Sequence, residues 1–417
     1  MSTVHVIGAG LAGLSAALWL SEERQGSVTV YEAGPAAGGR CRSFRDRTLG
    51  IEIDNGNHLL LSGNREAFRF IRAIGAEDRL DGPSAACFPF MDVKTGERWT
   101  VRPNGGRIPW WVLSSSRRVP RTRLSDYLQM LSIVRLKDNT PVGEVMRRGR
   151  LYWHLVEPLA IAALNTRPHE GLARLLGAVV RETLMRGGSA CIPRYPRGGL
   201  SSALIDPALA KLNERDVQVR FGRRIAALSI EGGRVSGLQM PDGTIVLGPE
   251  DSVVLAVPPW VATDLLPGLI APDSYEAILN VHFRFQPAPD SPLAETGFLG
   301  LLGGTAEWLF HKQDHISVTI SAANLMLNNE PEAIAGAVWA DIRVALDITD
   351  PIPPVRVIKE KRATFAATAR QEQRRPQART ELANLVLAGD WTATGLPATI
   401  EGAIRSGRTA AKLLLAG

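Results

Sequence analysis

Apolar residues at the start of the chain follow two periodicities in close succession. In "VHVIGAGLAGLSAALWL", Val4 and Ile7 bound a short apolar run that is typical of a buried strand. Leu11, Leu14 and Leu18 then recur at helical spacing, and the following "VTVYEA" returns to the pattern of a strand. The chain therefore opens with a predicted strand, a tight turn, a helix and a second strand, the unit from which parallel α/β sheets are built.

The rest of the apolar pattern divides the chain into two kinds of segment. Short strands alternate with glycine turns around Gly232–Gly233 and Asp242–Gly243. Elsewhere the pattern predicts helices over 125–135, 142–149, 151–164, 171–186 and 331–345, and strands over 280–286 and 306–321. Because 417 residues are too many for one ordinary core, we expect two lobes. The α/β lobe is expected to contain 1–81, 196–267 and 376–417, and an α+β lobe to contain 82–195 and 268–375.

Composition narrows the class of protein. With 45% apolar and 22% charged residues, the chain is typical of a globular protein. It has no run of about 18 apolar residues that could span a membrane, and its N-terminus does not have the pattern of a signal peptide. Cys41, Cys87 and Cys191 lack metal-ligand spacing, so we expect no metal site and a reducing, cytoplasmic location.

Basic residues concentrate in one block. Residues 98–150 contain 12 lysines and arginines against 3 acidic residues, a local balance of +9 in a chain of net charge +6. Such a block attracts an anionic surface, and no helix in it has a groove-reading pattern. We therefore expect peripheral contact with the inner face of the cell membrane through residues 108–123, rather than nucleic acid; the alternative is a solvated basic face with two core tryptophans. The candidate contact residues are Trp110, Trp111, Arg117, Arg118, Arg121 and Arg123.

The turn after the first strand has the spacing of a dinucleotide-binding loop. Gly8, Gly10 and Gly13 fit G-x-G-x-x-G, which permits a tight turn, close approach of the backbone to a pyrophosphate and close packing of helix and strand. Glu32 ends the second strand, where a carboxylate accepts hydrogen bonds from a ribose diol. The predicted contacts of this half of the nucleotide are Gly8, Gly10, Leu11, Ala12, Gly13, Glu32 and Ala33.

Two further segments resemble FAD enzymes of the amine-oxidase and phytoene-desaturase group. In "EAGPAAGGR" the acid is followed by two glycines and an arginine, as in that group, and "DNGNHLLL" resembles the strand and turn that pass its flavin ring. The resemblance implies a Rossmann-type, two-lobed flavoprotein in which Arg40 lies near the pyrophosphate and the backbone of Ile225 contacts the adenine. It adds Gly39, Arg40, Asn55, Gly56 and Ile225 to the expected FAD contacts.

The end of the chain, "LVLAGDWTATGLPATIEGAIRSG", resembles the last element of the same group. Gly389–Asp390 match its "GD", and Asp390 is implied to bind the ribityl chain or a water that bridges to the phosphates. Pro397 suits the first turn of a helix. The amides of Ala398, Thr399 and Ile400 would then face the flavin N1–C2=O edge, which becomes negative on reduction.

The same C-terminal motif, with "DNGNHLLL" and "EPLAIAALNT", is similar to the bacterial squalene-associated desaturases known as hydroxysqualene dehydroxylases. The resemblance implies reductive removal of an allylic hydroxyl from hydroxysqualene to give squalene in hopanoid synthesis, with hydride from reduced flavin N5. One proton donor is needed, and the candidates are His58, Asp54 and Tyr195. No second G-x-G-x-x-G follows a strand, so we expect an external electron donor.

Three other functions stay open at this point. A carotenoid-type desaturase would use the same fold in the oxidising direction. An amine oxidase usually has an aromatic cage beside the flavin, and the 6% aromatic content weighs weakly against one. A prenyl-lipid carrier would lack flavin, which the three glycines and Glu32 argue against.

Overall fold

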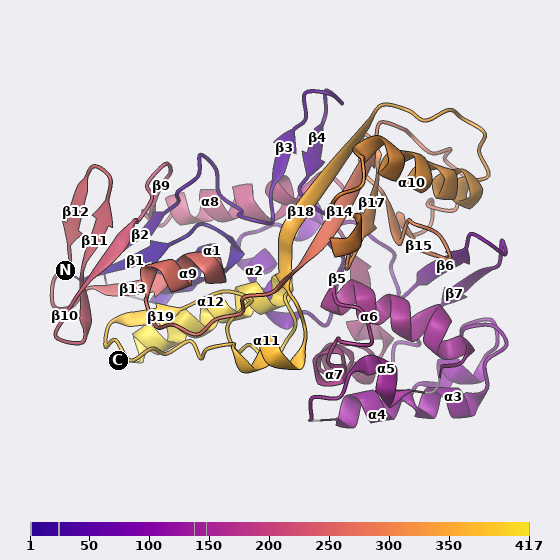
Figure 1. Ribbon diagram of the computed structural model, residues 1–417, viewed down its shortest axis with the longest axis horizontal. Coiled ribbons are helices and arrows are strands. Elements are labelled where there is room, and N and C mark those ends of the chain that lie inside the picture. Colours follow the sequence, from indigo (N-terminus) through magenta and orange to yellow (C-terminus); the bar gives the residue numbers. More distant parts are fainter. Residues whose placement is uncertain (1, 24–25, 137, 147, 417) are drawn as a thin grey trace.

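The computed structural model of the chain describes residues 2–23, 26–136, 138–146 and 148–416. Figure 1 shows an elongated molecule, with both termini near a parallel sheet at one end and a second sheet with a group of helices at the other. Two long strands of the second sheet, β14 (Tyr275–Phe283) and β18 (Val355–Phe365), lie near the middle of the view in Figure 1.

A five-stranded parallel sheet organises the end that carries the termini. Its order is β19–β13–β1–β2–β9, and every pairing is parallel. The strands at its centre are β-branched and buried, as expected where helices cover both faces. Segments from the beginning, middle and end of the sequence therefore meet in one sheet, whose strands are β1 (Thr3–Ile7), β2 (Ser27–Tyr31), β9 (Gln218–Arg220), β13 (Ser252–Leu255) and β19 (Leu385–Leu387).

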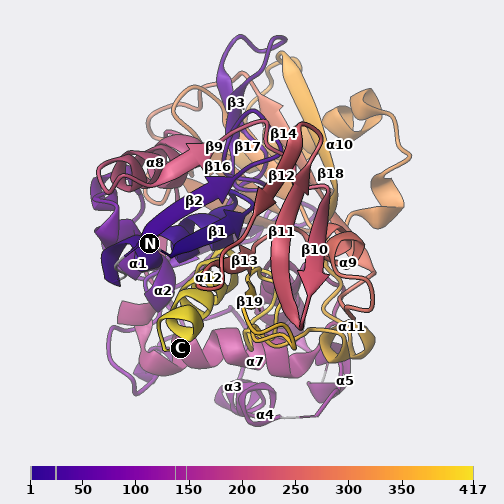
Figure 2. The same ribbon diagram turned by 90° about the vertical axis from the view of Figure 1, so that its left-hand side faces the viewer.

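The first and last long helices pack against each other beside this sheet (Figure 2). These are α1 (Leu11–Glu23) and α12 (Ile400–Leu415), and their contact depends on small residues. A Cβ at Gly407 would lie 2.1 Å from the carbonyl oxygen of Ala12, so only glycine permits this approach. Two further helices, α2 (Arg65–Ala73) and α8 (Asp206–Asn213), complete the core of this lobe.

A small antiparallel sheet and a short helix flank the parallel sheet (Figure 2). Its strands are β10 (Ala227–Glu231), β11 (Arg234–Met240) and β12 (Gly243–Val246), and the next helix is α9 (Pro259–Leu265). The turn between β10 and β11 has two glycines at positive φ, Gly232 (57°) and Gly233 (73°), as the sequence pattern predicts.

The second lobe is built on a seven-stranded mixed sheet in the order β18–β14–β17–β16–β15–β6–β7. Its apolar side chains alternate, and one set packs against α10 (Pro331–Leu346). The opposite face carries aromatic and polar side chains and turns toward the first lobe. Besides β14 and β18 the strands are β6 (Phe88–Asp92), β7 (Arg98–Val101), β15 (Phe298–Leu302), β16 (Trp308–His311) and β17 (Ile316–Ile320).

A helical unit completes the second lobe, and within the described ranges no helix has both the length and the apolar character needed to cross a bilayer. The helices are α3 (Leu124–Leu128), α4 (Met130–Arg135), α5 (Val142–Val145), α6 (Glu157–Leu164), which follows a π-helical turn (Tyr152–Val156), and α7 (Ala173–Glu182). The helix predicted over 142–149 thus ends at Val145, and its residue 147 lies outside the described residues.

The two tryptophans of the basic block lie in different environments, which corrects one expectation. Trp111 is only 2% exposed and packs edge-on against Tyr127, with ring centroids 5.4 Å apart, so it belongs to the core of the helical unit. Trp110 is half exposed, and the guanidinium of Arg117 lies over its ring. Of these two tryptophans, only Trp110 is exposed enough to take part in the predicted membrane contact.

Candidate functional site: an FAD-binding centre

The glycine loop has the geometry that a bound pyrophosphate requires. Gly8 has a φ of 105°, and a Cβ there would lie 2.6 Å from the carbonyl oxygen of Ala256. Gly13 allows α1 to approach β1, because a Cβ there would lie 1.9 Å from the carbonyl oxygen of Gly8. At Gly10, by contrast, a Cβ would meet nothing within 4 Å. The loop is therefore tight on the protein side and open at Gly10, at the N-terminus of α1 where anions bind.

Glu32 is fixed in place at the end of β2. Its carboxylate accepts hydrogen bonds from the N–H groups of Ala9 (2.9 Å) and Gly34 (2.8 Å). The backbone of Glu32 also exchanges hydrogen bonds with the segment 220–223, which leads directly to the buried Ile225. The expected ribose and adenine contacts thus lie beside one another, and the remaining lone pairs of the carboxylate suit a diol.

An ion pair joins the two ends of the chain at this centre. Arg40 donates to Asp390 at 2.6 Å and to the carbonyl oxygen of Ala363 at 2.6 Å. Gly38, two residues before Arg40, bridges to Gly10 in the glycine loop. Arg40 and Asp390 are therefore close to the loop, although 350 residues separate them in sequence.

The C-terminal motif is locked by close packing around its tryptophan. Gly389 has a φ of 153°, and a Cβ there would lie 2.3 Å from Nε1 of Trp391. The indole N–H of Trp391 donates to the carbonyl oxygen of Val257 (2.9 Å), and the ring is 1% exposed. The tryptophan that distinguishes this motif therefore fixes the segment that leads into α12.

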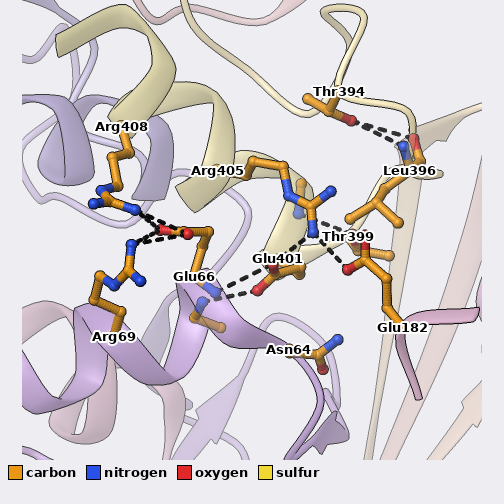
Figure 3. A network of polar contacts seen from close by, with 12 residues as sticks. Asn64, Glu66, Arg69, Glu182, Thr394, Leu396, Thr399, Glu401, Arg405 and Arg408 are labelled. Carbon is orange, nitrogen blue, oxygen red and sulfur yellow. Dashed lines mark hydrogen bonds and ion pairs between the residues drawn. The ribbon is translucent and has the colours of Figure 1, made fainter. Parts of the chain in front are cut away.

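The N-terminus of α12 is capped and anchored (Figure 3). Thr399 is the N-cap, and its hydroxyl accepts from the N–H of Gly402 at 3.0 Å. The first-turn amides of Ile400 and Glu401 have no intrahelical acceptors, as at every helix N-terminus. They are therefore available to a ligand at this helix end, and the contact of Pro397, Ala398 and these amides with the flavin edge stays a prediction.

A buried carboxylate ties this helix end to its neighbours. Glu401 is 2% exposed and accepts from the N–H groups of Glu66 (3.2 Å) and Ala67 (2.8 Å) at the start of α2. Arg405 bridges Glu401 (2.9 Å) to Glu182 (2.5 Å) on α7, as Figure 3 shows. The N-terminal end of α12 is therefore held from both lobes.

Asp54 lies in a buried ion pair that the sequence did not reveal. Its carboxylate binds Lys312 Nζ at 2.8 Å and accepts from Leu200 N–H and Ser43 Oγ, each at 2.7 Å. Burial alone would raise the pKa of Asp54, but Lys312 and these hydrogen bonds lower it below its ordinary value. Asp54 therefore has no proton to donate at neutral pH.

Burial shifts the pKa values of the other two candidate acids, His58 and Tyr195, in opposite directions. Burial lowers the pKa of His58 to about 4, so its ring is neutral at pH 7. Burial raises the pKa of Tyr195 to about 12. The Tyr195 ring packs with Phe298 and Phe310, and its hydroxyl lies against the backbone of Gly297.

A cluster of amides and hydroxyls faces the turn that contains Asn55 and Gly56. Asn280 on β14 donates to the carbonyl oxygen of Asn55 at 3.1 Å and fills the space beside Gly56. Asn57 donates to Ser317 Oγ (2.7 Å) and Thr319 Oγ1 (3.0 Å) on β17. These residues were not singled out from the sequence, although a polar residue such as Asn280 inside an apolar strand is a signal that could have found them.

The residues present fit an FAD molecule along its length. Glu32 and the segment to Ile225 suit the adenosine, the loop at Gly10 and the pair of Arg40 with Asp390 suit the pyrophosphate region, and the N-terminus of α12 suits the flavin edge. Among the described residues no group of histidine, cysteine or acidic side chains could hold a metal ion.

Comparisons with known proteins also indicate a flavin-dependent oxidoreductase. The model of the flavin containing amine oxidoreductase family matches residues 11–415. The chain is 47% identical to a hydroxysqualene dehydroxylase of Zymomonas mobilis over 416 residues, covering 100% of this chain and 99% of that protein. It is 48% identical to a hydroxysqualene dehydroxylase of Sinorhizobium fredii, covering 99% and 98%.

Among solved structures, a cyclohexylamine oxidase from Brevibacterium oxydans has the same fold, with a TM-score of 0.70 at 15% identity and coverage of 100% of this chain and 99% of that one. The structure and these matches agree that the protein is an FAD-dependent oxidoreductase. The chain belongs to the flavin containing amine oxidoreductase family, within the group whose named members are hydroxysqualene dehydroxylases.

Proposed function

We propose that the protein reductively removes the allylic hydroxyl of hydroxysqualene to give squalene, as the names of its relatives imply for them. The observation that carries the proposal is identity of nearly one half over essentially the whole chain to two proteins of that name. Squalene is the hydrocarbon precursor that the resemblance connects to hopanoid synthesis.

The reaction needs one proton and one hydride for each hydroxyl lost. Bound FAD, once reduced by an external donor, supplies the hydride from N5. The chain must hold the cofactor, exclude water and deliver the proton, so that the hydroxyl leaves as water. The cluster of Asn57, Asn280 and Thr319 supports this assignment, because the buried Oδ1 atom of Asn57 has no hydrogen-bond partner among the described residues and can accept from a substrate hydroxyl.

The alternatives receive less support from the same residues. A carotenoid desaturase would use the same FAD fold, but its polyene substrate has no oxygen for the amides and hydroxyls of this cluster to bind. A carrier without flavin would not need the open position at Gly10 or the carboxylate of Glu32 at the end of β2.

The substrate also requires contact with lipid. A thirty-carbon hydrocarbon chain costs about 0.8 kcal/mol per CH₂ to expose to water, roughly 20 kcal/mol in all, so it is collected from a membrane. The segment 108–128 supports such contact, since Ile108, Leu113 and Leu128 are 78%, 67% and 66% exposed within the basic block. We propose that this surface binds anionic lipid on the inner face of the cell membrane.

The proposed reaction is tested by anaerobic incubation of dithionite-reduced protein with hydroxysqualene. We expect squalene as the product, in an amount that matches the reduced flavin. The oxidised protein under the same conditions is the control and should give none. Recovery of unchanged hydroxysqualene from the reduced protein would rule out the proposed reaction.

A further inference from the structure

A row of hydroxyl side chains runs along β17 on the face of the sheet opposite α10. Ser317, Thr319 and Ser321 occupy alternate positions, and the apolar residues between them pack with α10. Asn57 donates to the first two, and Thr319 donates to Asn280 at 2.9 Å. The Oδ1 atom of Asn57 is buried and has no hydrogen-bond partner in the part of the chain that the structure describes. The row therefore starts at the flavin-facing turn with an acceptor that is still free.

Aromatic side chains on the adjacent strand lie next to this row. Trp308 and Phe310 on β16 are the register partners of Thr319 and Ser317, so they share one face of the sheet. Phe298 on β15 adds a third aromatic ring, whose centroid lies 6.2 Å from those of both Trp308 and Phe310. Aromatic faces attract cations by about 0.5–2 kcal/mol each, so groups that suit a hydroxyl lie directly beside groups that suit a planar cation.

Glu307 lies at the far end of the row. It immediately precedes Trp308, and its Oε2 accepts from the N–H of Ser321 at 2.7 Å. Ser321 is two residues beyond Thr319, about 7 Å along the strand. Glu307 is deeply set yet keeps some accessible surface, as His58 does.

The surroundings of Glu307 leave its charge uncompensated. In the described ranges it forms no ion pair within 4.0 Å. The charged side chain that acts on its carboxyl is Arg167, which follows α6. Asp341 on α10 is bound by the N–H groups of Thr305 and Ala306, which precede Glu307 in sequence. Burial raises the pKa of Glu307 to about 7, against the opposing effect of the Ser321 hydrogen bonds and Arg167. A large share of Glu307 thus carries a proton at neutral pH.

We propose that Glu307 is the general acid that protonates the leaving hydroxyl of the substrate. The inference rests on the proposed function. The carboxyl proton passes to the allylic hydroxyl held beside the β17 row, the C–O bond breaks with its electron pair, and water leaves. Trp308 and Phe310 face the allylic cation that remains, and the hydride supplied by reduced FAD completes the new C–H bond. The Glu307 carboxylate then takes a proton from solvent.

The first test reads the protonation of Glu307 without substrate. Infrared difference spectra of the FAD-loaded enzyme are recorded across a pH titration, for wild type, Glu307→Gln and the control Glu157→Gln. Glu157 on α6 is another partly buried carboxyl whose pKa burial raises. We expect a carboxylic acid C=O band that titrates near pH 7, is lost in Glu307→Gln and persists in Glu157→Gln. A band that survives in Glu307→Gln overturns the assignment.

The second test follows a single turnover of the reduced enzyme with hydroxysqualene, by flavin reoxidation and squalene formation. We expect Glu307→Gln to slow this step about 100-fold or more while FAD and substrate affinity stay unchanged, and Glu307→Asp to recover part of the rate. The wild-type rate should fall as pH rises through about 7, and Glu157→Gln should match it. A wild-type rate in Glu307→Gln overturns the role of Glu307 and leaves the proposed function standing. Absence of squalene from reduced wild type overturns both.

Discussion

At the scale of single residues, Glu32 tests the adenosine end of the FAD site. Its carboxylate holds two backbone N–H groups and is expected to accept from the ribose. Replacing Glu32 with Ala should weaken FAD binding by roughly 1.5–3 kcal/mol, the range for hydrogen bonds to a charged group. Glu32→Gln, which keeps the shape and one acceptor, should lose less. Flavin occupancy measured after dialysis checks this, and equal occupancy in wild type and Glu32→Ala would remove Glu32 from the site.

The ion pair of Asp54 and Lys312 makes a prediction about stability and pH. The folded-state pKa of Asp54 is below its unfolded value of about 3.9, so the pair stabilises the fold above that pH and is lost as pH falls through the folded-state pKa. Lys312→Met should cost about 3–5 kcal/mol at pH 7, because it leaves a buried charge unpaired, and less near pH 4.

Adding Asp54→Asn to Lys312→Met should restore much of this loss. Denaturant unfolding of the four proteins of the cycle, at pH 7 and pH 4, measures the coupling. A loss in Lys312→Met that is independent of pH would show that packing, and not the charge of Asp54, is responsible.

At the scale of elements, we expect Arg405 on α12 to influence the reduction potential of the bound flavin. It neutralises the buried Glu401 at the helix end that is predicted to face the flavin edge. In Arg405→Met the uncompensated carboxylate should disfavour reduced flavin and lower its potential, on the order of 30 mV for about 1.4 kcal/mol. Arg408→Met, one turn away and paired with Glu66, is the matched control. Dye-equilibrated reduction measures both, and equal potentials would show that Glu401 does not act on the flavin.

How far the sequence predicts these elements depends on whether their pattern is local. The strand, glycine loop, helix and acid of the first lobe follow one another in sequence, so spacing alone predicts β1, α1 and β2. The motif at Gly389–Asp390 was recognised for the same reason. Asn280, Lys312 and Glu307 could not be found from local spacing. Asn280 and Lys312 contact partners 225 and 258 residues away, and Glu307 contacts Ser321, 14 residues away, only once the chain is folded.

At the scale of the whole molecule, Arg40 and Asp390 from the two ends of the chain meet at the predicted cofactor site, and a segment from the middle of the chain is proposed to contact the membrane. Figure 1 shows the helices α3 to α5 at the opposite end of the molecule from both termini. Ile108, Trp110, Leu113, Leu124 and Leu128 are all at least 47% exposed on this unit. Because exposed apolar residues of this number are unusual on a surface that faces only water, they favour an interface with lipid.

The membrane prediction is best tested by replacing arginines whose side chains do not support the fold. Arg117 and Arg118 are half-buried and donate to the carbonyl oxygens of Arg102 and Val112, so their replacement would also disturb the fold. Arg107 and Arg123 are exposed, and each should contribute about 1 kcal/mol on an anionic surface. We expect Arg107→Glu with Arg123→Glu to release the protein from anionic liposomes in sedimentation, as high salt should, with little binding of wild type to neutral vesicles. Binding of the double variant as tight as wild type would exclude this surface, and the substrate would then have to enter elsewhere.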